Sequence, residues 1–238
     1  METTIRTASL PLHFIPTDQI GTAKSLQIDV KGLESELRKN VAGEVRFDDG
    51  SRGMYAHDAS NYRMVPLGVV LPKCAEDVIA TAAACRKYGA PLHGRGGGTG
   101  IPGQTVNDGV LLDFSKYMRA LLHISPDEKL AQVEPGIVLD ELRDAAKPYH
   151  LTFGPDPATH SRCTLGGMIG NNSCGIHSVM AGRTADNIES LDVLLYDGTR
   201  MQVGQTSEED LERIVREGGA EKAKSTASYA PCATDMPA

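Results

Sequence analysis

His93-Gly94-Arg95-Gly96-Gly97-Gly98-Thr99-Gly100-Ile101-Pro102-Gly103 is the stretch that decides the fold of this chain. It follows a short apolar run and precedes a second one, Val110-Leu111-Leu112-Asp113-Phe114. Glycines packed this densely let the backbone turn through positive φ and approach another molecule closely. Consecutive amide groups in such a loop can form a concave anion site. The stretch therefore predicts a loop that binds a phosphate or pyrophosphate.

Two common phosphate-binding motifs do not fit this loop. Gly98-x-Gly100-x-x-Gly103 matches the dinucleotide fingerprint, but in that fold the glycines open a helix. Here the chain continues through 106–109 into the strand at 110–114, so we reject a nicotinamide-binding Rossmann fold. A P-loop is excluded because no Gly-Lys-[Ser/Thr] follows the glycines. A flexible linker stays as the alternative, although a linker has no need of the cation that Arg95 supplies.

The sequence around the loop predicts an α/β lobe, because strand-like and helix-like patterns alternate along it. Apolar runs predict strands, and residues 75–88 place their apolar side chains mainly on one helix face before Gly89. The expected elements are a loose arm over 1–27, a helix over 29–42 ending at Gly43, a mostly irregular segment over 44–63, strands at 67–71, 91–93 and 110–114, and the helix at 75–88.

A second block with its own pattern follows. Short apolar runs across turn residues predict two hairpins, and Asp197-Gly198 is a strong turn signal in the second of them. The expected elements are a hairpin of 121–124 with 130–133, a helix over 138–147, a loop-rich stretch over 154–187, a hairpin of 188–196 with 200–203, a helix over 207–216 that Ser207 caps, and a disordered tail over 220–238.

The loop-rich stretch contains a second glycine cluster, Thr164-Leu165-Gly166-Gly167-Met168-Ile169-Gly170-Asn171-Asn172. Its glycines allow close approach of the backbone, and its hydroxyl and amide side chains offer donors and acceptors. Such a cluster can hold a ligand at close range through several hydrogen bonds. An ordinary glycine-rich turn capped by Asn and Ser is the alternative interpretation.

Together these motifs resemble one family. His93–Gly100 looks like the first flavin loop of FAD-linked oxidases of the p-cresol methylhydroxylase/vanillyl-alcohol oxidase (PCMH/VAO) type, nearest to the FAD subunits of D-lactate dehydrogenase and glycolate oxidase. The resemblance covers about 64–204. It is carried further by Val133-Glu134-Pro135-Gly136, Phe153-Gly154-Pro155-Asp156-Pro157-Ala158-Thr159, Cys163–Asn172, Gly175, Gly182-Arg183-Thr184 and Asp186-Asn187.

The resemblance implies an α+β fold, a PCMH/VAO-type FAD-binding domain of two α/β subdomains. We expect an N-terminal arm and helix at 1–61, subdomains at about 62–118 and 119–206, and a terminal helix and tail at 207–238. The resemblance also places a set of residues along FAD. They are Arg95, Gly96, Gly97, Gly98, Thr99, Gly100, Gln104, Pro135, Gly136, Pro155, Asp156, Pro157, Thr159, Thr164, Gly166, Gly167, Asn171, Asn172, Ser173, Gly175, Gly182, Thr184 and Ile188.

The implied function is oxidation of a 2-hydroxy acid, D-lactate or glycolate, by hydride transfer to flavin N5, with an unknown electron acceptor. Some family members carry a histidine in the first loop that bonds covalently to the flavin; Thr99 stands in that place, which predicts non-covalent FAD. The catalytic groups of the family lie in a C-terminal substrate domain, and nothing after 204 has that pattern. We therefore expect the cap domain to be missing, which leaves the catalytic residues unknown. The chain would then be a truncated product or a non-catalytic FAD-binding subunit that works with a partner. A flavoprotein similar to UDP-N-acetylenolpyruvylglucosamine reductase, which resembles this fold, is the alternative to a 2-hydroxy-acid oxidoreductase.

The composition of the chain argues against several classes of binding partner. The net charge of −7 and the absence of Trp argue against nucleic acid and anionic membranes, and no apolar run is long enough to span a bilayer. Five cysteines without a C-x-x-C pair predict neither an iron–sulfur nor a zinc site. We expect a cytoplasmic protein, membrane-peripheral only through a partner. Five groups near the glycine clusters are interpreted as hydrogen-bonding or packing residues rather than catalysts, namely His93, His160, His177, Cys163 and Cys174.

Overall fold

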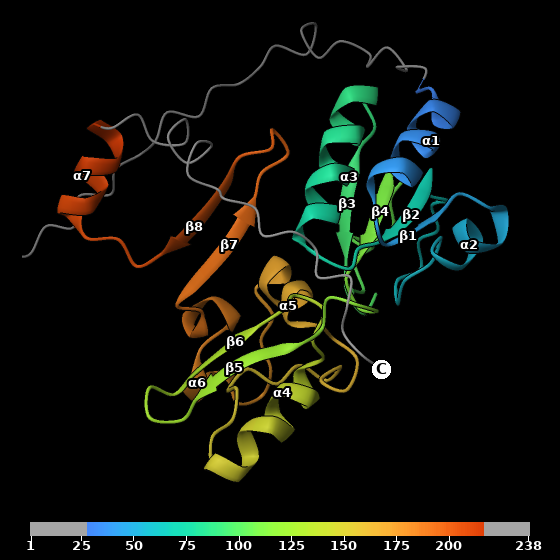
Figure 1. Cartoon of the computed structure of the whole chain (residues 1–238). Helices are drawn as coiled ribbons and strands as arrows, with labels where there is room; N and C mark the ends of the chain where they lie inside the picture. The colour runs from blue at the N-terminus through green and yellow to red at the C-terminus, as the bar shows by residue number, and fades with distance from the viewer. Residues whose placement is uncertain (1–27, 217–238) are drawn as a thin grey trace, which may run out of the picture.

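The computed structural model of this chain describes residues 28–216. The expectations of a loose arm over 1–27 and of a disordered tail over 220–238 lie outside the described residues. Figure 1 shows two lobes, the first built on a four-stranded sheet and the second on two hairpins with short helices. None of the helices between 28 and 216 is long and apolar enough to cross a membrane.

The sheet of the first lobe has the strand order β1-β2-β4-β3. Strands β2 and β3 run parallel to β4, whereas β1 is antiparallel to β2. Helices α1 and α3 contact each other and cover the sheet (Figure 1). The bounds are α1 Val30–Asn40, β1 Glu44–Arg46, α2 Asp49–Met54, β2 Gly68–Leu71, α3 Ala75–Tyr88, β3 Leu92–Arg95 and β4 Val110–Asp113.

The core of this lobe follows from the alternation of side chains along its two central strands. Val70, Val110 and Leu112 pack with Leu33 and Leu37 of α1 and with α3. The neighbouring residues Val69, Leu71 and Leu111 form a separate buried cluster, and Tyr55 packs against it. Strands that are buried on both faces read as continuous apolar runs, which is why the sequence predicted β2 and β4 well.

One expectation for this lobe missed two elements. Residues 44–63 are mostly irregular as expected, but they also contain β1 and α2, of 3 and 6 residues. Val45 lies in the core and pairs with Val70, so tertiary packing holds a strand too short to show a period of two. Asp48 caps α2 by accepting a hydrogen bond from the Ser51 amide at 2.8 Å. Since β1 belongs to the same sheet, this sheet extends N-terminal to residue 62, the expected start of the first subdomain.

The second lobe confirms both predicted hairpins, each an isolated antiparallel pair. Its buried cluster joins Leu139 and Leu142 of α4 to Leu165 and Met168 of α5. The Ser207 hydroxyl accepts from the Asp210 amide at 3.1 Å, as the cap of α7 requires. The elements are β5 Leu121–Ser125, β6 Leu130–Val133, α4 Leu139–Ala146, η1 Lys147–Tyr149, α5 Leu165–Asn171, α6 Ser178–Ala181, η2 Thr184–Asn187, β7 Ser190–Leu194, β8 Arg200–Gly204 and α7 Glu208–Arg216.

The stretch over 154–187 is rich in loops as expected, but it also contains three short helices that the sequence analysis did not predict, α5, α6 and η2. Glycine disfavours a helix interior, and α5 contains three glycines. The Thr164 side chain caps α5, and Leu165 and Met168 are 2% and 0% exposed. Burial and capping therefore offset the poor propensity of the second glycine cluster.

Candidate functional site

The first glycine cluster leaves β3 at Arg95, at the carboxyl end of a parallel strand pair. In the described part of the chain, the amides of Gly96–Gly100 donate no hydrogen bond to the protein. Gly98 has φ +63°, a left-handed conformation that favours glycine. The loop thus offers a run of unengaged backbone donors, which is what an anion-binding concavity needs.

Arg95 does not extend from the loop. Its Nη2 donates to the His57 carbonyl oxygen at 2.7 Å, and its Nη1 lies 3.5 Å from the carbonyl oxygen of Tyr55. The guanidinium also lies over the Tyr55 ring, 5.4 Å from its centroid. The cation that distinguished the loop from a linker is therefore engaged by the residues before it.

The second glycine cluster forms helix α5 and the turn before it. Thr164 is buried, and its Oγ1 accepts from the Gly167 amide at 3.3 Å. The Gly166 amide donates to the Pro135 carbonyl oxygen at 2.8 Å, and a Cβ on Gly166 would lie 2.9 Å from that same oxygen. Gly136 is held in turn, since its amide donates to Met118 at 2.7 Å. Three of the expected site residues, Pro135, Gly136 and Gly166, thus form one packed unit.

The fold brings the two clusters into direct contact. A Cβ on Gly96 would lie 2.1 Å from Thr164 Oγ1, and one on Gly97 would lie 2.3 Å from the Arg162 carbonyl oxygen. Further along the loop, Gln104 Nε2 donates to Asn171 Oδ1 at 2.7 Å. The close approach leaves no room for a side chain at either glycine. Residues about 65 positions apart in the sequence therefore form one surface.

Four more of the expected residues, Asp156, Asn172, Ser173 and Thr184, hold the segments after α5. Thr184 Oγ1 donates to the Ser173 carbonyl oxygen at 2.7 Å, and the Ala185 amide donates to Asn172 Oδ1 at 2.9 Å. Asp156 Oδ1 accepts from the His177 amide at 2.9 Å. Together these bonds tie η2 and the residues around His177 to the segments that carry Asp156, Asn172 and Ser173.

Not all of the expected residues share one surface. Pro135, Gly166 and Ile188 line a cavity of about 1020 Å³ between hairpin β5–β6, hairpin β7–β8 and the start of α3. No residue of the loop Gly96–Gly100 lines it. Asn171 and Asn172 do not line it either, so the expected residues divide between the junction of the two clusters and this cavity.

Two histidines near the site, His160 and His177, contact carboxylates. His177 Nδ1 contacts Asp156 Oδ2, and His160 Nδ1 lies 2.8 Å from Asp140 Oδ1. The His177 contacts hold the pKa of the Asp156 carboxyl below its ordinary value. Burial, with a smaller contribution from Arg95, lowers the pKa of His93. Burial raises the pKa of the Cys163 thiol, so it is a poor nucleophile. No cluster of three metal-ligating side chains occurs between 28 and 216.

Sequence reasoning missed the segment that supports the first loop. Besides Tyr55 and His57, it includes Ala59, whose amide donates to the Gly98 carbonyl oxygen at 3.0 Å. Thr105, just beyond the loop, donates to Asp58 Oδ2 at 2.5 Å. Residues 55–59 show no periodicity and no motif, so their polar side chains were the only signal in the sequence of a part in the site.

A mixed α/β lobe, a hairpin lobe and two glycine clusters that meet between them define an α+β domain of the PCMH-type flavin-binding class. Comparison with known proteins agrees, because the FAD binding domain family matches residues 66–204. The chain belongs to this family.

Known relatives share part of this chain. It is 36% identical over 172 residues to the D-2-hydroxyglutarate dehydrogenase of Pseudomonas putida, over 71% of this chain and 17% of the relative. It is 34% identical over 181 residues to the glycolate oxidase subunit GlcD of Escherichia coli K12, over 74% and 36%. The structure of an alkyldihydroxyacetonephosphate synthase superposes with a TM-score of 0.66 at 22% identity, over 78% and 40%. The chain thus spans well under half of the length of these proteins.

Proposed function

We propose that this chain binds FAD without a covalent bond and serves as the flavin-binding part of a 2-hydroxy-acid oxidoreductase. The observation that carries this proposal is the run of unengaged amides at Gly96–Gly100, packed against Thr164 at the start of α5. Family membership implies FAD. A backbone concavity suits a pyrophosphate, because several amides can donate to the same anion at once.

The residues present fit the cofactor in kind. The loop amides are the donors for the pyrophosphate, and the second cluster offers hydroxyl and amide groups for the flavin ring. When bound, the flavin supplies the acceptor of a hydride at N5. The chain's own part is to position the cofactor and to hydrogen-bond it. Asn171 and Asn172 already hold Gln104 and Ala185, so we expect them to orient the site through these partners.

Thr99 is the basis for proposing dissociable FAD, since a threonine hydroxyl stands where covalent relatives place a histidine. Denaturing the purified, FAD-loaded chain with acid and pelleting the protein tests this point. We expect the yellow colour in the supernatant. Flavin that stays with the washed pellet would contradict non-covalent binding.

A matched pair of glycine variants tests the loop. In Gly97→Ala the new Cβ would meet the Arg162 carbonyl oxygen at 2.3 Å, whereas in Gly170→Ala the Cβ meets nothing within 4 Å. FAD and FMN are titrated into the full chain while flavin fluorescence is followed. We expect FAD to bind more tightly than FMN, which lacks the pyrophosphate, and Gly97→Ala to weaken FAD binding at least about tenfold, with Gly170→Ala unchanged. Equal FAD affinity in the two variants would show that the loop does not belong to the FAD site.

The substrate class rests on the relatives. The names of these relatives refer to D-2-hydroxyglutarate, glycolate and D-lactate, which share a carboxylate next to a hydroxylated carbon. We propose that the protein served by this flavin site oxidises such an acid and passes electrons to an acceptor, with a partner subunit as a further proposal. Anaerobic addition of each acid to the FAD-loaded chain, with flavin bleaching as readout, is the test.

A non-catalytic FAD-binding subunit is the second candidate function. It predicts flavin binding without bleaching by any of the three acids. Bleaching followed by steady turnover at roughly 1–10³ s⁻¹ by the purified chain alone would exclude this candidate.

A further inference from the structure

The first glycine loop is held by residues 55–59, which lie between α2 and β2. Arg95 reaches back across the loop, and its Nη2 lies 2.6 Å from where a Cβ on Gly98 would stand. The same guanidinium donates to the His57 carbonyl oxygen and stacks on the Tyr55 ring. The Gly98 carbonyl oxygen in turn accepts from the Ala59 amide. Loop and segment therefore hold each other through two separate contacts.

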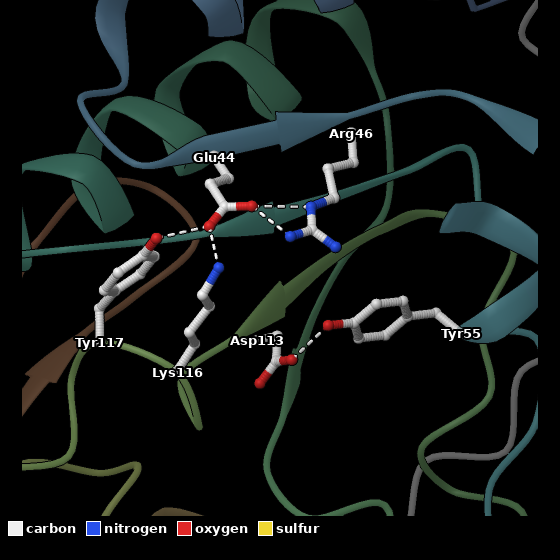
Figure 2. A network of polar contacts seen from close by, with 6 residues as sticks. All are labelled: Glu44, Arg46, Tyr55, Asp113, Lys116 and Tyr117. Atoms are coloured by element: carbon white, nitrogen blue, oxygen red, sulfur yellow. Dashed lines mark hydrogen bonds and ion pairs between the residues drawn. The ribbon is translucent and has the colours of Figure 1, made fainter. Parts of the chain in front are cut away.

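This supporting segment is fixed to the sheet by a buried carboxylate. Tyr55 Oη donates to Asp113 Oδ2 at 2.5 Å, a bond that Figure 2 shows at the end of β4. Asp113 is 6% exposed and also accepts from the Ser115 amide at 2.9 Å. In the β3–β4 pair Asp113 is the register partner of Arg95. Arg95, Tyr55 and Asp113 thus form a closed circuit, which the pairing of Arg95 with Asp113 in the β3–β4 register completes.

The circuit assigns Arg95 a role other than the obvious one. A cation inside a phosphate loop suggests direct contact with the pyrophosphate. Here the planar guanidinium has two carbonyl oxygens and an aromatic face as partners, which is geometry that a lysine cannot reproduce. Through these contacts the positive charge of Arg95 faces Tyr55 and His57 rather than the open side of the loop.

We propose that residues 55–59 are part of the cofactor site and that Arg95 is a positioning residue, which holds the amides of Gly96–Gly100 in their FAD-binding shape through Tyr55 and His57. This inference rests on the proposed function. It adds a segment that lies outside the family match at 66–204.

The first experiment uses the full chain without cofactor. Hydrogen exchange is followed at the Ala59 amide and at the β4 amides in wild type, Arg95→Met and the control Arg38→Met. Arg38 carries the same charge, and it pairs with Glu34 on the distant helix α1. We expect faster exchange at Ala59 in Arg95→Met alone, with β4 unchanged. Unchanged exchange at Ala59 would overturn the positioning role, whatever the chain binds.

The second experiment measures FAD affinity and its salt dependence. We expect Arg95→Met, Arg95→Lys and Tyr55→Phe each to weaken FAD roughly tenfold, the scale expected when hydrogen bonds to charged groups are lost. Since the charge does not face the phosphates, the salt dependence of binding should equal that of wild type. Affinity kept in Arg95→Lys, or a flatter salt dependence in Arg95→Met, would overturn the inference in favour of a phosphate contact.

The two readouts separate the possible failures. A wild-type chain that binds no FAD contradicts the proposed function and, with it, the cofactor part of this inference. In that case the exchange at Ala59 still reports whether Arg95 holds the loop. Should Arg95→Met not fold, the exchange at Ala59 is measured in Arg95→Lys, which keeps the charge but loses the planar guanidinium, and we expect faster exchange there too; unchanged exchange in that variant would overturn the positioning role.

Discussion

Glu44 is the side chain whose ionisation the structure perturbs most clearly among the carboxylates. It lies on β1, and Figure 2 shows its two oxygens facing Arg46, Lys116 and Tyr117. Arg46 Nε donates at 2.8 Å, and Tyr117 Oη and Lys116 Nζ donate to the other oxygen. These donors, with Lys116 foremost, lower the pKa of Glu44 from 4.5 to about 2.

A pH dependence of stability follows from this shift. The folded pKa lies below the unfolded one, so the ionised form contributes stability that is present above about pH 4.5 and is lost as pH falls toward 2. Because the carboxylate is partly exposed, we expect Glu44→Gln to cost about 1 kcal/mol or less at pH 7. Chemical denaturation from pH 7 to pH 2 should show the two proteins converging. A constant difference over that range would contradict the assignment.

At the scale of the elements, the buried carboxylate of Asp77 links the end of α1 to the start of α3. Asp77, in the first turn of α3, is 2% exposed. Its Oδ1 accepts from the Ala42 amide at 2.7 Å, just after α1, and its Oδ2 accepts from the Lys73 amide at 2.8 Å. One carboxylate thus accepts from two backbone amides, one just after α1 and one just before α3, and so links the two helices.

Removing this carboxylate should cost more than removing an exposed one. Asp77→Ala removes two part-buried hydrogen bonds to a carboxylate, and hydrogen bonds to charged groups typically contribute about 1.5–3 kcal/mol each. Asp144→Ala on the exposed face of α4 should stay within about 0.5 kcal/mol of wild type. Urea unfolding of both variants measures the difference. Equal midpoints would show that Asp77 does not link the two helices.

For the whole molecule, the two lobes differ in how deeply their strands are buried. All four residues of β2 and of β4 are buried, whereas no residue of β8 is. Isolated two-stranded sheets are marginal in water unless something covers them. The stability of the chain should therefore be concentrated in the first lobe.

Hydrogen exchange of the full chain checks this difference. We expect the amides of β2 and β4 to exchange slowest and those of β7 and β8 to exchange much faster, through local opening. FAD should add protection at 96–104 and 164–173, with little change in β2. Equal exchange in all four strands without FAD would contradict the uneven stability.

Several elements could be predicted because their signal is local. Helix α3 has the bounds that its periodicity and Gly89 indicate, and Asp197-Gly198 marks the turn of β7–β8. Strand β1 and helix α5 could not be predicted, since the first is three residues long and the second contains three glycines. Contacts with Val70 in one case, and burial of Leu165 and Met168 in the other, stabilise them.

By itself, the sequence determined the family, the glycine loop after β3 and the second cluster that begins at Thr164, because glycine density and turn residues act over a few neighbouring positions. Only the tertiary structure decided that Gly96 packs on Thr164 and that Arg95 turns back to Tyr55 and His57. These contacts join residues about 40 to 70 positions apart, and their geometry depends on the β3–β4 register and on the end of a buried strand at Asp113. Periodicity along the chain does not predict such contacts, because they depend on the packing of side chains that are distant in the sequence.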